Sequence, residues 1–161
     1  MQTTTCTLNV RFTSQATRAL YESGGGLSYA TEYAAGMDLR ACLPAECDGV
    51  SIGPGERYLV PSGIAIEPCT PHTAGFVYSR SGLGAKQGLV VAQGVGVIDA
   101  DYRGEIMVML LNTSGEVRFL ARGERMAQLV IQPVMRAELR VVDALGQTER
   151  GDGGFGHTGK I

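Results

Sequence analysis

The sequence predicts an all-β protein, on three observations. Its apolar residues recur in many short runs with the period of strands, Gly, Pro, Asp or Ser separates most runs, and a long amphipathic helix is hard to find. This combination is typical of a β-sandwich or barrel. The 161 residues fit one domain and are enough to bury a sizeable core.

Ten short strands are expected, because turn-forming residues separate most of these apolar runs: 8–12, 37–41, 57–60, 63–67, 75–78, 89–92, 105–111, 117–120, 126–131 and 139–142. Two short helical segments are expected as well. Residues 17–22 make a turn or two before a run of three glycines stops them, and residues 82–87 form the other segment. At positions 94 and 96, alternating glycines followed by β-branched residues predict a hairpin whose backbone is closely approached.

The chain ends in ERGDGGFGHTGKI, residues 149–161, in which five of the thirteen residues are glycine. Glycines this dense cannot build a core, because they bring no side chain to pack and lose much conformational freedom on ordering. We therefore expect a β domain over residues 1–148 and a flexible arm over residues 149–161. The single aromatic ring of Phe155, among cationic and hydroxyl side chains, suggests that the arm covers a ligand.

Composition excludes several classes of function. The 14 Lys and Arg residues nearly balance the 16 Asp and Glu residues, so the net charge of −2 argues against nucleic acid as a partner. The longest apolar run, residues 106–111, is far too short to cross a bilayer, and the first ten residues show no secretory signal. No membrane partner and a cytoplasmic location are expected.

The four cysteines form no CxxC pair, and the chain has only two histidines, so a zinc site is not expected. We expect the cysteines to be buried, reduced thiols.

Three polar stretches allow a functional interpretation beside a plain one. Asp99 and Asp101 would share a face of an extended chain, either as a solvated turn or as a base beside a carboxylate that helps to hold a cation. Residues 79–86 combine hydroxyls, glycines and cations, the groups needed to bind phosphate oxygens, although loops of this composition are common. Arg125 would ordinarily be a surface charge, whereas Gln128 among apolar residues needs hydrogen-bond partners.

Taken in order, five segments resemble the five motifs of the trimeric deoxyuridine triphosphate nucleotidohydrolases, the dUTPases. They are AGMDLRA (35–41), RSGLGAKQG (80–88), GVIDADYRG (96–104), GERMAQ (123–128) and RGDGGFGHTG (150–159). The resemblance implies a jelly-roll-like fold, a homotrimer with shared active sites, and Mg²⁺-dependent cleavage of dUTP to dUMP and pyrophosphate. That reaction would limit uracil incorporation into DNA and supply dUMP for dTMP synthesis.

The resemblance also assigns roles to residues of the body. Asp99 would orient and deprotonate the attacking water, and Tyr102 would pack under the deoxyribose and exclude a 2′-hydroxyl. Ser81 would touch the oxygen that bridges the α- and β-phosphates. Asp38 would hold the metal indirectly, through water. Further substrate contacts are expected from Arg80, Gly82, Gln93, Gly94, Val97 and Gln128.

Uracil would be selected by the hairpin at residues 94–97. Its backbone amides and carbonyls would match the O4 acceptor and the N3–H donor of uracil and leave cytosine with unpaired polar groups.

In the arm, Phe155 would stack on uracil and Arg150 would meet the γ-phosphate, commonly on another subunit. Gly156 and Thr158 would close around phosphate oxygens. The sequence departs from the family pattern at two positions, where Ser79 stands for a usual proline and His157 for a usual serine. His157, when protonated, could replace that serine as a donor.

Two alternatives remain open from the sequence. A dCTP deaminase has a similar fold, but it would need a catalytic glutamate and typically lacks the motif that carries the phenylalanine. A noncatalytic module that senses nucleotides or binds a partner would not need an intact Asp99 and an intact arm.

Overall fold

The structure, a computed structural model, describes residues 5–154. Two short helices, α1 (Gln15–Ser23) and α2 (Ser81–Gln87), interrupt a chain of antiparallel strands. The strands in order are β1 (Leu8–Phe12), β2 (Met37–Arg40), β3 (Gly49–Ile52), β4 (Arg57–Pro61), β5 (Ile64–Pro68), β6 (Thr73–Ser79), β7 (Leu89–Val91), β8 (Val95–Ile98), β9 (Met107–Asn112), β10 (Arg118–Ala121) and β11 (Arg125–Pro133).

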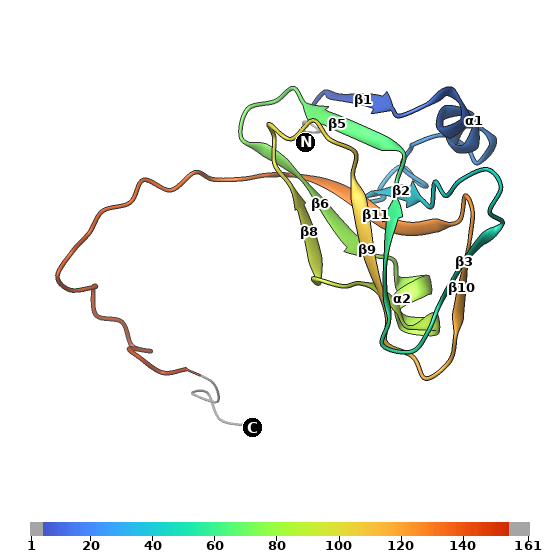
Figure 1. The fold of residues 1–161 in the computed structure, drawn as a ribbon. Coiled ribbons are helices and arrows are strands. Elements are labelled where there is room, and N and C mark those ends of the chain that lie inside the picture. The colour runs from blue at the N-terminus through green and yellow to red at the C-terminus, as the bar shows by residue number, and fades with distance from the viewer. Residues whose placement is uncertain (1–4, 155–161) are drawn as a thin grey trace.

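The strands form four antiparallel sheets, which confirms the all-β prediction. The largest sheet has the order β2-β11-β6-β8, a second has the order β4-β9-β7, and β10-β3 and β1-β5 are two-stranded. Figure 1 shows them gathered into one body, with α1 at its edge beside β1 and α2 at the end of β6. The expected helical segments at 17–22 and 82–87 are both confirmed as parts of α1 and α2.

One cluster of buried apolar side chains draws on all four sheets and forms the core. Leu39, Ile64, Leu110 and Leu120, from β2, β5, β9 and β10, have no exposed surface. Along β2 and β9, buried residues alternate with more exposed ones, so these strands turn one face toward the core and the other away from it. The residues of the predicted site lie on those outer faces or on the loops that follow them.

Helix α1 is fixed to the body by Tyr21. Ser14 caps the helix, because its hydroxyl accepts a hydrogen bond from the Thr17 amide at 3.0 Å. The Tyr21 ring is fully buried, its hydroxyl donates to the Ser62 carbonyl at 2.9 Å, and it accepts from the Arg40 amide at 3.1 Å. Burial raises the pKa of this hydroxyl, so it stays protonated and bonded both to β2 and to the turn between β4 and β5.

The strand predicted at 139–142 is wrong, and β3 was not expected. After Pro133 the described chain leaves the body as a long extended segment, orange to red in Figure 1, which runs into the start of the predicted arm. Leu139 and Val141 are 90% and 98% exposed there, and within residues 5–154 the segment pairs with no strand. An alternating apolar pattern makes a strand only where a neighbour completes its hydrogen bonds. β3 was not predicted, because only one of its four residues, Ile52, has a buried side chain.

The prediction of buried thiols is wrong in part. All four cysteines are free, but Cys6 and Cys69 are exposed. Cys42 is half-buried, and burial raises its pKa to about 11, so its thiol stays protonated and donates to the Ser62 carbonyl. Over residues 5–154, no helix has the length and apolar composition to cross a membrane.

We expect Tyr21→Phe to lower the free energy of unfolding by about 1–3 kcal/mol, because the Ser62 carbonyl and the Arg40 amide each lose a buried partner. Urea denaturation at a fixed protein concentration measures this. Tyr58→Phe is the control, since Tyr58 is 40% exposed. Equal stabilities of the two variants would show that the Tyr21 hydroxyl does not hold α1 in place.

Candidate active site

Three strands bring a carboxylate and two guanidinium groups together on the outer face of the largest sheet. Asp38 on β2 lies between Arg80, which follows β6, and Arg125, which begins β11. Arg80 Nε donates to Asp38 Oδ1 at 2.7 Å, and Arg125 Nη1 donates to Asp38 Oδ2 at 3.0 Å. Arg80 Nη1 also donates to the Arg125 carbonyl at 3.0 Å. Two cationic charges thus face one anionic charge, and the cluster keeps a net positive charge.

Gln128 completes this group. The register of β11 sets it opposite Asp38 on one side and opposite Tyr78 on the other. Its amide nitrogen donates to the Ser79 carbonyl at 3.1 Å, which satisfies the prediction that an amide at this position needs partners. Asp38, Arg80, Ser81, Gly82, Arg125 and Gln128, with four small residues at 30–36, line an open pocket of about 230 Å³.

The structure therefore brings together the predicted residues of the first, second and fourth motifs. Their donors, two guanidinium groups, a hydroxyl and an amide, are those that bind phosphate oxygens. Sequence reasoning missed Arg125, which it treated as a surface charge. A signal for Arg125 was available in the sequence. It lies three residues before Gln128 in the fourth motif, and residues this close on one strand lie in the same region of a sheet.

The residues predicted to select the base and to activate water lie on β8 and the loop after it. Gly94 has φ +81°, a conformation that favours glycine, and its carbonyl and amide flank the turn that enters β8. Val97 points outward and is 58% exposed, whereas Gly96 packs against β6, where an added Cβ would lie 3.2 Å from the Cβ of Val77. Gln93 is exposed beside the turn.

Asp99 and Tyr102 stand on the loop between β8 and β9. Asp99 is exposed, so its carboxylate is accessible, and its carbonyl accepts from the Tyr102 amide at 3.1 Å. The Tyr102 hydroxyl donates to the Glu105 carbonyl at 3.0 Å, which holds the ring across the loop and leaves it 45% exposed. An exposed ring beside an exposed carboxylate is suited to cover a sugar next to the reacting phosphate.

The two groups of residues stand at opposite ends of β6. Ile98 pairs with Gly75, four residues before Ser79, the residue where β6 ends next to Arg80 and Ser81. At about 3.4 Å per residue, this register separates the two ends by about 13 Å. A base must reach its proton directly or through one water. Within one chain, the loop that carries Asp99 therefore lies away from the phosphate pocket along β6.

The described part of the arm adds one predicted contact residue. Arg150 is exposed, and its side chain donates to the Gly153 carbonyl at 2.8 Å within the arm itself. The predicted contacts Phe155, Gly156, His157 and Thr158 lie outside the described residues.

The donor set bears on the predicted Mg²⁺. Over residues 5–154 no group of three or more His, Cys, Asp or Glu side chains is placed to hold a metal ion. Both carboxylate oxygens of Asp38 accept from arginines, although each retains a lone pair for a water molecule. This arrangement fits an ion that takes most of its ligands from phosphates and water, as Mg²⁺ often does.

A jelly-roll-like β body, a cationic pocket for phosphate oxygens and a carboxylate on an exposed loop define a class of nucleotide-binding β proteins. Within that class, the chain belongs to the dUTPase family, whose sequence profile matches residues 25–159. The deoxyuridine 5′-triphosphate nucleotidohydrolase of Salmonella typhimurium strain LT2 is 47% identical over 133 residues, which are 83% of this chain and 86% of the relative.

Solved structures agree with this family. The dUTPase of Staphylococcus bacteriophage 80alpha with dUPNHPP is similar with a TM-score of 0.76 at 26% identity, over 95% of this chain and 98% of that chain. A mutant dUTPase from phage phi11 of S. aureus, described as coordinating a structural Mg(II) ion, has the same fold, with a TM-score of 0.69 at 24% identity. The similarity spans 88% of this chain and 99% of that chain.

Proposed function

We propose that this protein hydrolyses dUTP to dUMP and pyrophosphate, in active sites that two or more copies of the chain build together. The main support for this activity is the pocket around Asp38, Arg80 and Gln128 in a member of the dUTPase family. The positive charge of this pocket suits the binding of phosphate oxygens. The substrate belongs to the pool of DNA precursors, so the cytoplasm is the expected compartment.

In the proposed reaction, the Asp99 carboxylate takes a proton from a water molecule. The water oxygen forms a bond to the α-phosphorus, and the bond from that phosphorus to the bridging oxygen breaks. The electron pair leaves on pyrophosphate, where negative charge builds up. A general base contributes about 10²–10⁴-fold to a rate, so fixed donors aimed at the phosphates supply much of the remainder.

The phosphate donors suit that task because they are held in place before substrate arrives. Arg80 is bound at two nitrogens, by Asp38 and by the Arg125 carbonyl. Ser81 opens α2 next to it and would contact the bridging oxygen, and Gly82 leaves the approach open, since a Cβ added there meets nothing within 4 Å. A bound Mg²⁺ would neutralise phosphate charge, and Asp38 would reach it through water.

Discrimination among nucleotides is assigned to the hairpin at residues 94–97, to the loop that follows it and to the arm. The backbone of residues 94–97 would pair with O4 and N3–H of uracil, with Val97 and Gln93 beside the base. Tyr102 would lie under the deoxyribose and leave no room for a 2′-hydroxyl. The arm would close the site through Arg150, Phe155, Gly156, His157 and Thr158, and release of product would require it to open.

Two observations support shared sites, with a homotrimer as the expected assembly. First, Asp99 and the phosphate pocket are separated along β6, and in the proposed assembly a second copy of the chain would bring its Asp99 to the nucleotide held in the pocket. Second, the extended segment between Pro133 and the arm exposes large apolar side chains, among them Met135 at 99% and Leu145 at 87%, and soluble chains rarely leave such a stretch uncovered. A neighbouring subunit would cover it.

The activity is tested by incubating the protein with each deoxynucleoside triphosphate and Mg²⁺. We expect pyrophosphate from dUTP and no ammonia from dCTP. Asp99→Asn should retain binding of a nonhydrolysable dUTP analogue and lose most turnover, on the order of 10²–10⁴-fold in kcat. Asp101→Asn is the matched control on the same loop. A near-parental kcat for Asp99→Asn would remove the assigned base, and ammonia from dCTP would favour the deaminase.

Shared sites predict complementation between two inactive variants. When Arg80→Ala and Asp99→Asn chains are co-expressed in equal amounts and mix at random, about one quarter of the sites receive an intact half from each chain, so activity should return to roughly that level. Either variant alone stays inactive. Sites formed within one chain would give no recovery in the mixture.

If Asp38 helps to hold Mg²⁺, its substitution should weaken nucleotide binding by different amounts with and without the ion. We expect Asp38→Asn to weaken binding of a nonhydrolysable dUTP analogue on the order of tenfold, because one charge-assisted network is lost, and to weaken it more with Mg²⁺ than with a chelator. Calorimetry measures both affinities. Glu116→Gln, which removes an exposed pair with Arg118, is the control. An equal loss in both conditions would limit Asp38 to holding the two arginines.

A further inference from the structure

Arg103 binds the loop that carries Asp99 and Tyr102 from within. Its side chain folds back over the loop, and Nη1 donates to the Ala100 carbonyl at 2.7 Å and to the Tyr102 carbonyl at 3.2 Å. Ala100 directly follows Asp99, and Tyr102 directly precedes Arg103. Because the loop lies between β8 and β9 and has no ladder partner, such contacts determine its shape.

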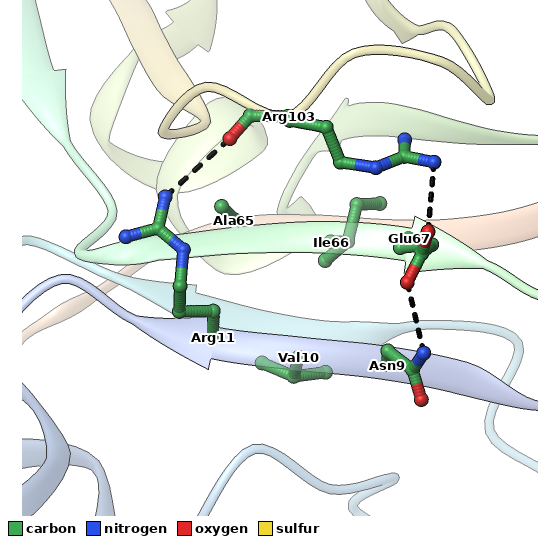
Figure 2. Close-up of a pocket in the computed structure, with 7 residues that line it drawn as sticks. All are labelled: Asn9, Val10, Arg11, Ala65, Ile66, Glu67 and Arg103. Atoms are coloured by element: carbon green, nitrogen blue, oxygen red, sulfur yellow. Dashed lines mark hydrogen bonds and ion pairs between the residues drawn. The ribbon is translucent and has the colours of Figure 1, made fainter.

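The guanidinium of Arg103 is in turn held by residues that lie outside all five motifs. Arg103 Nη2 pairs with Glu67 Oε1 at 2.9 Å, and Glu67 Oε2 accepts from the Asn9 side-chain amide at 2.9 Å. Glu67 is on β5 and Asn9 is its partner on β1, so the two strands present one carboxylate to the loop. Figure 2 shows the series from Asn9 through Glu67 to Arg103 along one side of a pocket.

The other end of the loop is fixed separately. Arg11 Nη2 donates to the Arg103 carbonyl at 3.4 Å on the opposite side of the same pocket (Figure 2). Glu105 Oε1 accepts from the Gly63 amide at 2.6 Å, which binds the end of the loop to the turn before β5. Near Asp99, the Arg103 contacts thus act together with the hydrogen bond from the Tyr102 amide to the Asp99 carbonyl.

The pair of Glu67 and Asn9 is preorganised for this contact. The hydrogen bond from Asn9 and then the charge of Arg103 lower the pKa of the Glu67 carboxyl, so it remains ionised. An arginine that is half-exposed has many rotamers available, and a carboxylate already oriented by a second donor selects one of them.

We infer that Glu67 and Asn9 are positioning residues for catalysis, which act through Arg103 to hold the loop that carries Asp99 and Tyr102 in the reactive geometry. This inference rests on the proposed role of Asp99 as the base. An exposed ion pair contributes little to stability, but a small displacement of a base lowers the rate strongly. The pair should therefore influence turnover far more than folding.

The test compares Glu67→Gln with Glu22→Gln in the full-length protein. Glutamine keeps the shape but has one oxygen for two donors. We expect kcat for dUTP to fall on the order of tenfold, with the affinity for a nonhydrolysable analogue and the melting temperature nearly unchanged. Glu22→Gln removes a comparably exposed pair with Arg18 on α1 and should leave kcat unaltered. Unchanged kcat in Glu67→Gln, or a fall matched by the control, overturns the inference.

Charge reversal separates positioning from simple pairing. In the double variant Glu67→Arg with Arg103→Glu an ion pair can form again, but residue 103 no longer donates to the carbonyls of Ala100 and Tyr102. We expect kcat to stay low in this variant. Recovery of kcat would mean that only the ion pair matters and that the loop contacts do not.

A double-mutant cycle with Asp99→Asn separates this inference from the proposed function. If Glu67 acts through Asp99, Glu67→Gln lowers kcat in the parental protein and has little further effect when Asp99 is asparagine. An equal loss in both backgrounds overturns the positioning role, while the activity of Asp99→Asn by itself decides whether Asp99 is the base.

Discussion

The pairing of β6 with β8 on one side and with β11 on the other is the constraint on which the arrangement of this site depends. The β11 pairing places Gln128 and Asp38 next to the end of β6, where Arg80 follows. The β8 pairing places Asp99 near the opposite end, next to the residue that pairs with Gly75. A slip of one residue in either register would turn alternate side chains to the other face. The separation is therefore built into the sheet, and assembly of copies is the proposed means of uniting the two groups.

The residues around Asp38 and the loop that carries Asp99 differ in their electrostatic environment. Around Asp38, two arginines share one carboxylate, so the pocket keeps a positive charge while each guanidinium is held by a short hydrogen bond. Fixed cations of this kind stabilise phosphate oxygens with little reorganisation. Asp99 instead is exposed, on a loop shaped by hydrogen bonds between its own backbone and Arg103. The proposed phosphate donors are thus part of the sheet, whereas the proposed base stands on a loop.

The sequence predicted the parts of this protein that depend on local pattern. Runs such as Leu8–Phe12 are strands at the expected residues, and the glycines after α1 end it where expected. The segment at 139–142 has the apolar pattern of a strand but no pairing partner in the part of the chain that the structure describes, so periodicity alone gave a wrong prediction. Glu67 could not be assigned, because its contact with Arg103 joins residues 36 apart in sequence that only the folded sheets bring together. The contact of Arg125 with Asp38 spans 87 residues, and only its place in the fourth motif pointed to it.

The contacts of Arg103 and Glu67 explain how the loop that carries Asp99 can be exposed and still have a defined shape. Five consecutive residues, 99–103, lie largely in solvent, where backbone hydrogen bonds to water compete with internal ones. A single guanidinium that satisfies two loop carbonyls and one carboxylate replaces several separate contacts, because its donors have a fixed planar geometry. A lysine could not bind all three acceptors in the same fixed orientation. The loop therefore gains a defined shape from one side chain, while its outer surface, with Asp99 and Tyr102, stays open to the nucleotide.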